Sequence, residues 1–238
     1  MEPSDFATAE VRELRRQVAL ACRILYKLGL ADYLGHPSAR IGDGPYVVIK
    51  PGKSTSIRGM AEMTTEQMLV VDLDGRQYLG DDPPPMELSL HLEIYRARPD
   101  VNAVVHTHQL MTTCFGTVGR PILPILHLEG PLVAEGIAVF PHAYLITEPA
   151  RGRAVAEALG NAALLHLQGH GIVTTGPTIA EATLAAIYLE RLAQANYVAH
   201  TLGVPRIIPP DEIELLRAEV APPAGRWAYY ASLVEEPE

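Results

Sequence analysis

The sequence has few cysteines and no excess of basic residues, and each absence excludes a class of protein. Its two cysteines, Cys22 and Cys114, lie far apart within apolar patterns, so there is neither a disulfide framework nor a zinc ribbon. We expect both to be buried free thiols. The formal net charge is -9 at pH 7, and no stripe of lysines and arginines is present. These features argue against a nucleic-acid-binding protein.

Two further absences concern membranes and export. The longest apolar runs are too short and too interrupted to cross a bilayer, so we expect no membrane partner. The N-terminus is acidic and carries no visible secretory signal, which favours a cytoplasmic location. The chain has 238 residues, of which 48% are hydrophobic and 20% are charged. We therefore predict a single domain over 1–238 with a sizeable core and a C-terminal tail from about residue 205.

The spacing of apolar residues predicts helices interleaved with short strands. The expected helices span residues 5–26, 87–96, 110–116, 149–159 and 179–200, and a further helical turn or two starts at 211. The expected strands are one ending near 41 and those over 46–49, 69–73, 101–108, 163–168 and 171–175. Several strands are joined by hairpins, so the pattern predicts an α/β fold. Its central, mainly antiparallel mixed sheet would be covered by helices on both faces.

Helix boundaries are predicted from capping residues. Ser4 or Asp5 can cap the first helix, and Thr178 with Glu181 forms a capping box at the start of the long helix near the C-terminus. Glycines and prolines interrupt every periodicity over 121–143, so no element is assigned there.

The most informative feature is a His-x-His pair at the end of a valine-rich strand. Residues i and i+2 of a strand point to the same face, so His106 and His108 project side by side. His170 stands between two glycines and could add a third imidazole, which would leave positions open for a substrate. His-x-His alone is a weak signal in a chain with nine histidines, and each of these residues could instead be packed or on the surface.

Glu87 lies at the predicted start of the helix that leads into the His-x-His strand. A helix N-terminus stabilises a carboxylate, so Glu87 on its own could be an ordinary first-turn glutamate. Residues 87–108, however, read E-x3-H-x3-Y-x2-R-P-D-x-N-A-V-V-H-x-H, and this stretch resembles the class II aldolase/adducin family. That family includes fuculose-phosphate aldolase and the ribulose-phosphate 4-epimerases. Residues 167–171 resemble its third-histidine segment, residues 35–40 resemble its early substrate loop, and the whole resemblance covers roughly 8–200.

The resemblance implies a three-layer α/β/α sandwich and a homotetramer with active sites at subunit interfaces. It places a divalent metal on His106, His108 and His170, and the acid/base carboxylate on Glu87. Imidazole ligands suit Zn²⁺, Mn²⁺, Fe²⁺ and Co²⁺ alike, so the ion is left open. The epimerases usually have aspartate in place of Glu87, which favours an aldolase-like or decarboxylase-like enzyme.

The sequence departs from the family where its members hold a sugar phosphate. Two serines precede the catalytic acid in phosphosugar enzymes, and here Pro85 and Met86 take their places with no side-chain donor. The phosphate loop becomes Ile49-Lys50-Pro51-Gly52, and the expected tyrosine proton donor becomes Leu128. Both the phosphate cradle and one proton relay are therefore expected to be missing.

A metal on neutral imidazoles keeps its positive charge and can stabilise the enolate or phenolate that loss of carbon dioxide produces. The substrate carboxylate needs polar partners in the protein. Several of the candidates could instead be ordinary surface charges or, for the tyrosine, an aromatic packing residue. The candidate substrate-binding residues are His36, Ser38, Arg40, Lys50, Gly52, Lys53, Arg58, His127, Glu129 and Tyr229. The other histidines, expected to be packed or on the surface, are His91, His142, His166 and His200.

The leading hypothesis is a metal-dependent carbon–carbon lyase that decarboxylates a small hydroxyaryl or β-keto carboxylic acid. The first alternative is a class II retro-aldolase that acts on a hydroxy-carbonyl substrate and releases an aldehyde or ketone. A non-haem iron oxygenase would depend on dioxygen. A non-catalytic, adducin-like interaction module is disfavoured because the three histidines and the glutamate are all present.

Overall fold

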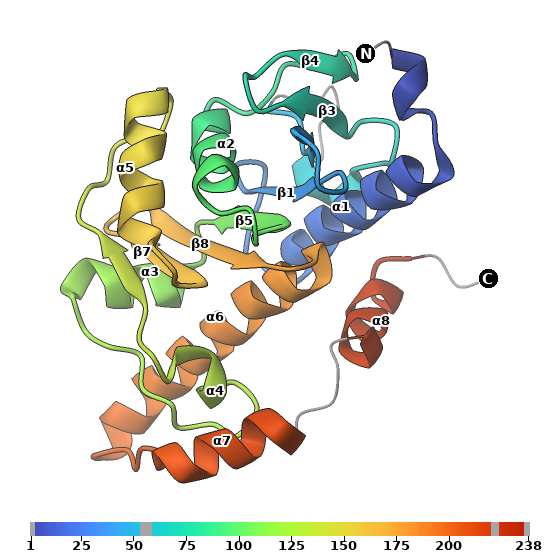
Figure 1. Ribbon diagram of the computed structural model, residues 1–238. Helices are drawn as coiled ribbons and strands as arrows, with labels where there is room; N and C mark the ends of the chain where they lie inside the picture. Colours follow the sequence, from blue (N-terminus) through green and yellow to red (C-terminus); the bar gives the residue numbers. More distant parts are fainter. Residues whose placement is uncertain (1–2, 53–58, 220–223, 236–238) are drawn as a thin grey trace.

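An eight-stranded sheet forms the centre of the computed structural model, which describes residues 3–52, 59–219 and 224–235 (Figure 1). The strand order is β4-β3-β2-β1-β5-β8-β7-β6. All neighbouring strands are antiparallel except β6 and β7, which are parallel. The strands are β1 (His36–Arg40), β2 (Tyr46–Ile49), β3 (Leu69–Asp72), β4 (Gln77–Leu79), β5 (Ala103–Thr107), β6 (Ala138–Phe140), β7 (Leu164–Leu167) and β8 (Gly171–Gly176).

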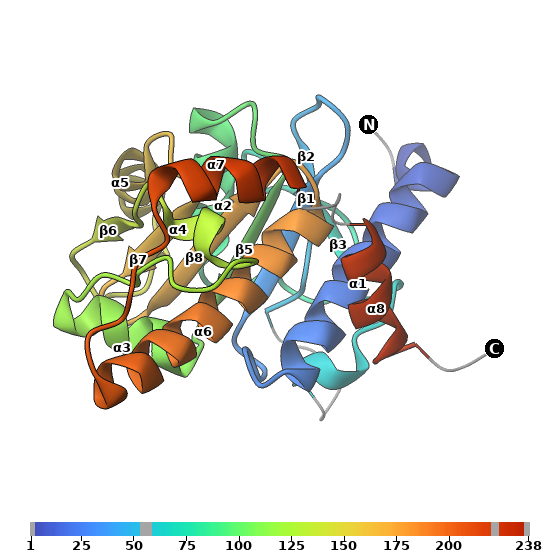
Figure 2. The ribbon, with the colours of Figure 1, turned by 90° about the horizontal axis from the view of Figure 1, so that it is seen from below.

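Helices cover both faces of this sheet. Helices α1, α3, α6 and α8 lie on one face, and α2 and α5 lie side by side on the other (Figures 1 and 2). This arrangement confirms the predicted three-layer α/β/α fold with a mainly antiparallel sheet. The α-helices are α1 (Ala9–Lys27), α2 (Leu88–Ala97), α3 (Leu110–Val118), α4 (Gly130–Val133), α5 (Pro149–Leu159), α6 (Ile179–Leu202), α7 (Pro210–Glu219) and α8 (Ala224–Ser232).

The strands of the middle of the sheet bury both of their faces. Along β5, Val105 belongs to the core beneath α1 and α6, whereas Val104 belongs to the core beneath α2 and α5. This period of two places His106 on the same face as Val104, under α2. The continuous apolar run before His106 is therefore explained by two packed helical layers rather than by one.

The first helix begins later than the sequence analysis predicts. Thr8, rather than Ser4 or Asp5, is the N-cap, and its Oγ1 accepts a hydrogen bond from the Val11 amide at 3.2 Å. Residues 3–6 instead form a short 3-10 helix. Phe6 is buried against the rings of Tyr46 and Tyr78, and this packing directs the preceding turn away from the α1 axis.

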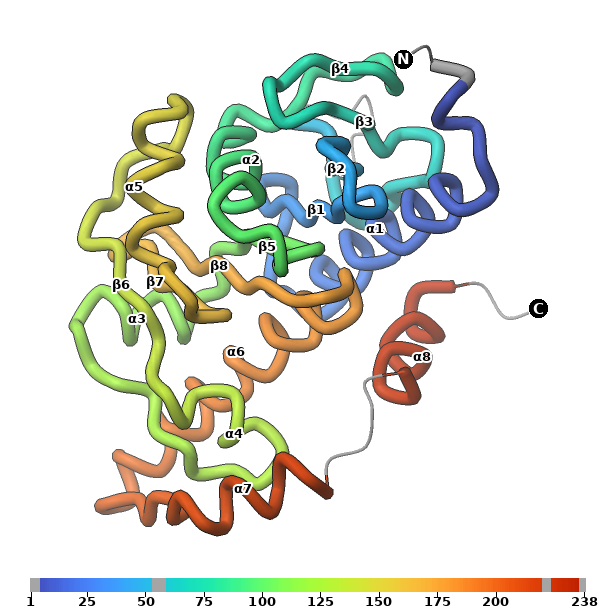
Figure 3. The backbone as a smooth tube through the Cα atoms, in the orientation of Figure 1, coloured from blue at the N-terminus to red at the C-terminus, as the bar shows by residue number. Residues whose placement is uncertain are grey.

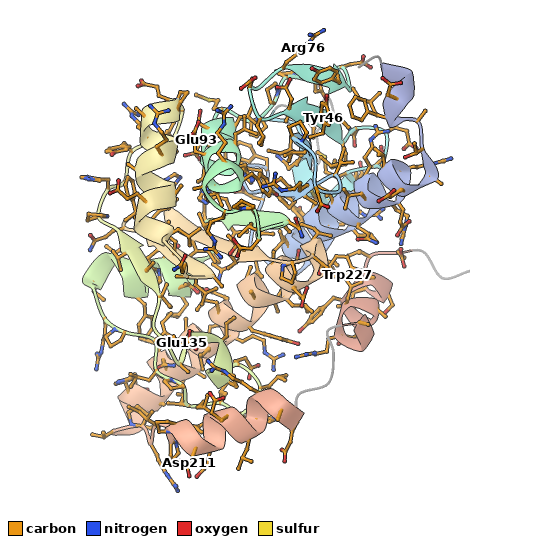
Figure 4. All side chains as sticks on the ribbon, viewed as in Figure 1. Tyr46, Arg76, Glu93, Glu135, Asp211 and Trp227 are labelled. Carbon is orange, nitrogen blue, oxygen red and sulfur yellow. The ribbon has the colours of Figure 1, made fainter. Side chains whose placement is uncertain are left out.

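Several short elements were not predicted. Strand β4 pairs with β3, and the segment without periodicity contains α4 and β6. Helix α7 matches and extends the helical turn predicted from residue 211, whereas α8 was not predicted; Figure 3 shows both helices. Trp227 on α8 packs at the edge of the core beside α1 and α6 (Figure 4).

The two cysteines differ from each other. Cys22 is buried as predicted, but the prediction for Cys114 is wrong because Cys114 is exposed. It lies on the outer side of α3, whose inward face is formed by Thr112, Phe115 and Gly116. Within the described part of the chain, no helix combines the length and apolar character needed to cross a membrane.

Candidate metal centre

Three histidines converge at one end of the central strand pair. His106 lies on β5 opposite His36 of β1 and Val173 of β8, and His108 follows directly after β5. His170 lies in the turn between β7 and β8, where Gly169 has a positive φ of 75°. Because β5 and β8 are antiparallel neighbours, the end of β5 lies beside the start of β8. The sheet itself therefore brings the three imidazoles together.

The arrangement of the nitrogen atoms suits a divalent ion. His106 Nδ1 lies 2.8 Å from the Ile172 carbonyl, so this nitrogen carries the proton and Nε2 presents a lone pair. His106 Nε2 and His108 Nε2 are 2.9 Å apart, and both ring nitrogens of His170 are buried without a hydrogen-bond partner. One ligand atom from each of these histidines and from Glu87 lies within 4.8 Å of all the others. A cation between them would satisfy these otherwise unpartnered groups.

Glu87 lies immediately before α2 and directs its carboxylate into the same space. It caps no backbone amide of its own helix. Instead, Oε1 accepts a hydrogen bond of 2.7 Å from the Ile146 amide, and Oε2 lies 3.4 Å from His170 Nε2 and 3.6 Å from His106 Nε2. The side chain is 5% exposed. The position of Glu87 at the start of α2 therefore places its carboxylate among the histidines, and the Ile146 amide holds the carboxylate there.

The electrostatics favour neutral imidazoles beside an ionised carboxylate. Burial lowers the pKa of His106 well below its ordinary value and also lowers the pKa of His108. Burial raises the pKa of the Glu87 carboxyl, but polar interactions with His170, His36 and His106 lower it by more, and the net direction is downward. In the resting protein Glu87 is therefore a proton acceptor, and His106 and His108 have lone pairs available for a metal.

A cavity of about 750 Å³ opens beside this cluster. Among the described residues, the ionisable side chains of His36, Lys50, Glu87 and His108 reach it, and the rest of the described wall is predominantly apolar. Such a combination is typical of a site for a small organic ligand. The apolar and glycine residues of the wall are Tyr33, Leu34, Gly52, Gly59, Met63, Pro83, Pro84, Pro85, Met86 and Leu145.

Lys50 is a buried cation on the wall of the cavity. It is 2% exposed, and its Nζ donates to the carbonyls of Tyr33 and Pro51, each at 3.0 Å. An ammonium has three donors, so one remains for an anion. No carboxylate among the described residues forms an ion pair with it, and burial lowers its pKa.

The segment that aligns with the phosphate loop is closed by the prolines. The Gly52 amide donates to the Pro83 carbonyl at 2.9 Å, so this backbone donor is already used. A Cβ on Gly52 would lie 2.6 Å from Pro84 O and 2.7 Å from Pro85 Cα. Gly52 therefore allows the close approach of the proline segment, and it lines the cavity without offering its amide.

The other predicted substrate-binding residues have different positions. Ser38 is fully buried behind His36, and Arg40 donates to the Tyr95 carbonyl at 2.7 Å. Neither residue lines the cavity. Lys53 and Arg58 lie outside the described residues.

Three predicted residues lie apart from the cavity of this single chain. His127 and Tyr229 are exposed, whereas Glu129 is buried with its Oε1 3.3 Å from Arg191 Nε. For His127 and Tyr229, a contact with substrate would therefore require a neighbouring chain, whereas Glu129 is engaged within its own chain.

His91 and Tyr95 are part of the family motif, but neither was predicted to contribute to the site; His91 is packed, which is one of its two expected positions. Both are buried on the face of α2 that follows Glu87, and His91 Nε2 lies 2.7 Å from His36 Nδ1. The signal was present, because positions 87, 91 and 95 are four residues apart and share one helix face.

Comparisons with known proteins agree with this geometry. The class II aldolase and adducin N-terminal domain matches residues 16–197. The 3,4-dihydroxyphthalate decarboxylase of Arthrobacter keyseri is 36% identical over 199 residues, which cover 79% of each protein. The 5-methylthioribulose-1-phosphate/5-deoxyribulose-1-phosphate aldolase of Rhodospirillum rubrum is 31% identical over 202 residues, covering 84% of this chain and 88% of that enzyme.

A solved structure extends the agreement to the whole fold. The L-fuculose 1-phosphate aldolase from Glaciozyma antarctica superimposes with a TM-score of 0.80 and 23% identity, over 96% of this chain and 92% of that one. The named relatives are decarboxylases and aldolases, which are both lyases. One assignment follows from the sheet, from the three histidines at the ends of its central strands and from the matched domain. The chain belongs to the class II aldolase and adducin family.

Proposed function

We propose that this lyase decarboxylates a small hydroxyaryl carboxylic acid, with a divalent ion held by His106, His108 and His170. The observation that carries the proposal is the combination of this histidine set with the proline wall over Gly52. The histidine set supports chemistry that needs an electron sink. The proline wall means that Gly52, within the described part of the loop, offers no backbone amide to a phosphate. The 36% identity to a 3,4-dihydroxyphthalate decarboxylase points to the same substrate class.

The metal, when bound, supplies positive charge that stabilises negative charge on the hydroxyl oxygens of the substrate. Glu87, ionised at rest, takes the proton of a substrate hydroxyl. When the carbon–carbon bond to the carboxylate breaks, its electron pair stays on the ring carbon and carbon dioxide leaves. Glu87 then returns its proton to that carbon, so the carboxylate is regenerated and the atoms balance.

Lys50 is the proposed anchor for an anionic group on the substrate. Its ammonium lines the cavity, has a donor to spare and has no carboxylate partner in the described structure. A benzene ring would pack between the apolar wall residues, such as Pro84 and Leu145. A β-keto acid fits the same electron sink but makes less use of this apolar wall.

The test is the release of carbon dioxide from a panel of hydroxyaryl and β-keto acids, with Zn²⁺, Mn²⁺, Fe²⁺ or Co²⁺ added after chelator treatment. We expect release from a dihydroxyaryl acid that requires metal and disappears in His106→Ala. His200→Ala is the matched control, because His200 lies near the end of α6, far along the chain from the sheet-edge cluster. Metal-independent release, or full activity in His106→Ala, would contradict the proposal. Turnover of no acid and of no aldol substrate would favour a non-catalytic module.

The second candidate is a retro-aldolase, and the 31% identity to the Rhodospirillum rubrum aldolase favours it. The same charge stabilisation serves an enediolate formed from a hydroxy-carbonyl substrate. Product analysis separates the two, because only aldol cleavage releases an aldehyde or ketone. A requirement for dioxygen would instead identify an iron oxygenase.

We further propose a homotetramer in which the exposed His127 and Tyr229 reach the cavity of a neighbouring subunit, whereas Glu129 is held beside Arg191 of its own chain. The positions of His127 and Tyr229 away from the cavity of their own chain motivate this assignment. Sedimentation analysis should give four chains of 25.8 kDa per particle. A monomer with full activity would refute it. The cytoplasmic location stays a prediction.

A further inference from the structure

A buried chain of hydrogen bonds runs behind the cavity from α2 to His36. Tyr95 OH and Ser38 Oγ are 2.8 Å apart, and Ser38 Oγ lies 2.6 Å from His91 Nδ1. His91 Nε2 then lies 2.7 Å from His36 Nδ1. Ser38 and His91 have no exposed surface, while Tyr95 is 1% and His36 is 4% exposed. Only the His36 end of this chain reaches the cavity.

Two periodicities bring these four side chains together. His36 and Ser38 are two residues apart on β1 and point to the same face, toward α2. His91 and Tyr95 are four residues apart on α2 and face the sheet, where α2 passes over β1 and β5 (Figure 1). The chain is therefore built from regular secondary structure, which fixes its geometry.

The proton positions along the chain follow from the donors and acceptors available. Ser38 Oγ is the acceptor in hydrogen-bond reach of the Tyr95 hydroxyl among the described residues, so Tyr95 donates to Ser38. Ser38 then donates to His91 Nδ1, which places the single imidazole proton of His91 on Nε2. His91 Nε2–H in turn donates to His36 Nδ1, and His36 must carry its proton on Nε2.

If every hydrogen bond of this chain ran the other way, the Tyr95 hydroxyl and His36 Nε2 would both be unfavourably placed. Ser38 would donate to Tyr95 or to the Val104 carbonyl at 3.5 Å, and the buried Tyr95 hydroxyl would have no acceptor. The lone pair of His36 Nε2 would then face the Glu87 carboxylate, whose Oε2 is 3.8 Å away. Repulsion between a lone pair and a carboxylate disfavours this arrangement.

We propose that the Tyr95–Ser38–His91 chain holds His36 as an Nε2–H donor that faces Glu87 and the substrate anion. His36 would then contact the substrate, and His91, Ser38 and Tyr95 would be positioning residues that act through it. The part concerning substrate rests on the proposed function, whereas the proton positions do not. The proposal also explains why His36, although its ring centroid is 4.9 Å from that of His106, is not a fourth metal ligand. A nitrogen that bears a proton has no lone pair for an ion.

Neutron diffraction from deuterium-exchanged crystals of the Zn²⁺-loaded protein tests the proton positions directly. We expect deuterium on Nε2 of both His36 and His91 and none on His36 Nδ1. Deuterium on His36 Nδ1 would overturn the proposal. This measurement needs no reaction, so its outcome is separate from the success or failure of the decarboxylase assignment.

Binding of 2,3-dihydroxybenzoate to the Zn²⁺-loaded protein, measured by calorimetry, tests the donor role. Loss of a hydrogen bond to an anion weakens binding by roughly 10- to 100-fold, and we expect this for His36→Leu. His36→Gln retains an N–H group at a similar reach and should recover most of the affinity. Tyr95→Phe should give a smaller loss, with metal content unchanged.

The matched control is Tyr197→Phe, because Tyr197 is 55% exposed on α6 and belongs to no part of this chain of contacts. It should bind the probe like the unmodified protein. Equal affinity in His36→Leu and the unmodified protein, or loss of affinity in His36→Gln as large as in His36→Leu, would overturn the donor role.

Discussion

Gly171 packs directly against His108, since a Cβ at position 171 would lie 2.9 Å from His108 Cδ2 and 3.2 Å from His106 Cε1. It would also collide with the Thr107 carbonyl. The substitution Gly171→Ala must therefore displace two candidate metal ligands. We expect at least a 10-fold loss of Zn²⁺ affinity, measured by competition with a chromogenic chelator. Gly203→Ala is the control, because nothing lies within 4 Å of a Cβ there, and it should leave affinity unchanged.

Removal of the metal should destabilise the fold. An ion that binds the native state at 100 times its Kd adds about 2.7 kcal/mol to the free energy of unfolding. For a chain of this size we expect the melting temperature to fall by roughly 5–10 °C after chelation and to recover with added Zn²⁺. In His106→Ala the melting temperature should not respond to the metal. An equal response in that variant would place the ion elsewhere.

Glu87→Gln should lower kcat by roughly 10²- to 10⁴-fold, because an amide cannot take up and return a proton. Its carbonyl oxygen can still accept the hydrogen bond from the Ile146 amide, so the fold should persist. Steady-state rates and metal content should be measured on the same preparation. Unchanged kcat with metal bound would assign the proton transfer to another group.

His166 should make stability depend on pH. It is 5% exposed, its Nδ1 has no hydrogen-bond partner, and burial lowers its pKa to about 4. An unfolded histidine titrates near its ordinary value of about 6.5, so the unfolded state binds the proton first as the pH falls. The contribution of His166 is intact above that value and is lost between about pH 6.5 and 4. About 2 kcal/mol of it has been lost by pH 5.

Urea unfolding at pH 7.5 and pH 5 measures this effect. We expect the unmodified protein to lose about 2 kcal/mol more than His166→Gln between the two pH values, because glutamine does not titrate. The loss is compared between the unmodified protein and His166→Gln because the other buried histidines titrate in both proteins. Equal losses would mean that His166 is as easily protonated in the fold as in the unfolded chain.

Much of the sheet could be predicted because its strands carry local signals. The valine-rich run before His106 and the hairpin strands 46–49 and 69–73 correspond closely to β5, β2 and β3. Thr178 is confirmed as the N-cap of α6, since its Oγ1 accepts from the Glu181 amide, but the Glu181 carboxylate accepts from the Thr178 hydroxyl at 2.8 Å instead of from the Thr178 amide, so the box is only half formed. Each of these signals is encoded within a few neighbouring residues.

The missed elements depend on partners far along the chain. Strand β6 is only Ala138–Phe140, and it exists because it pairs with β7. Helix α3 was predicted over 110–116, but the contact that fixes its start is equally distant, because the Glu190 carboxylate of α6 accepts from the amides of Met111 and Thr112, each at 2.9 Å. Neither pairing has a signature in the local sequence.

The residues of the candidate site could be predicted from the sequence, but the contacts between them could not. The spacing of His106 and His108 predicted their common face, and the family resemblance added His170 and Glu87. The hydrogen bonds of His91 to His36 and Ser38 depend on how α2 sits over β1, which only tertiary packing decides. The same holds for Lys50, whose burial follows from its contacts with two backbone carbonyls.

The pairing of β5 with β8 also governs when the site can exist during synthesis. A ribosome delivers His106 and His108 well before His170, and β5 has no partner on that side until residues 171–176 have emerged. A nascent chain therefore passes through a stage with two imidazoles and no third. If the proposed ion binds all three histidines, it can do so only as the last central strand docks, and metal loading would then mark the completion of the sheet.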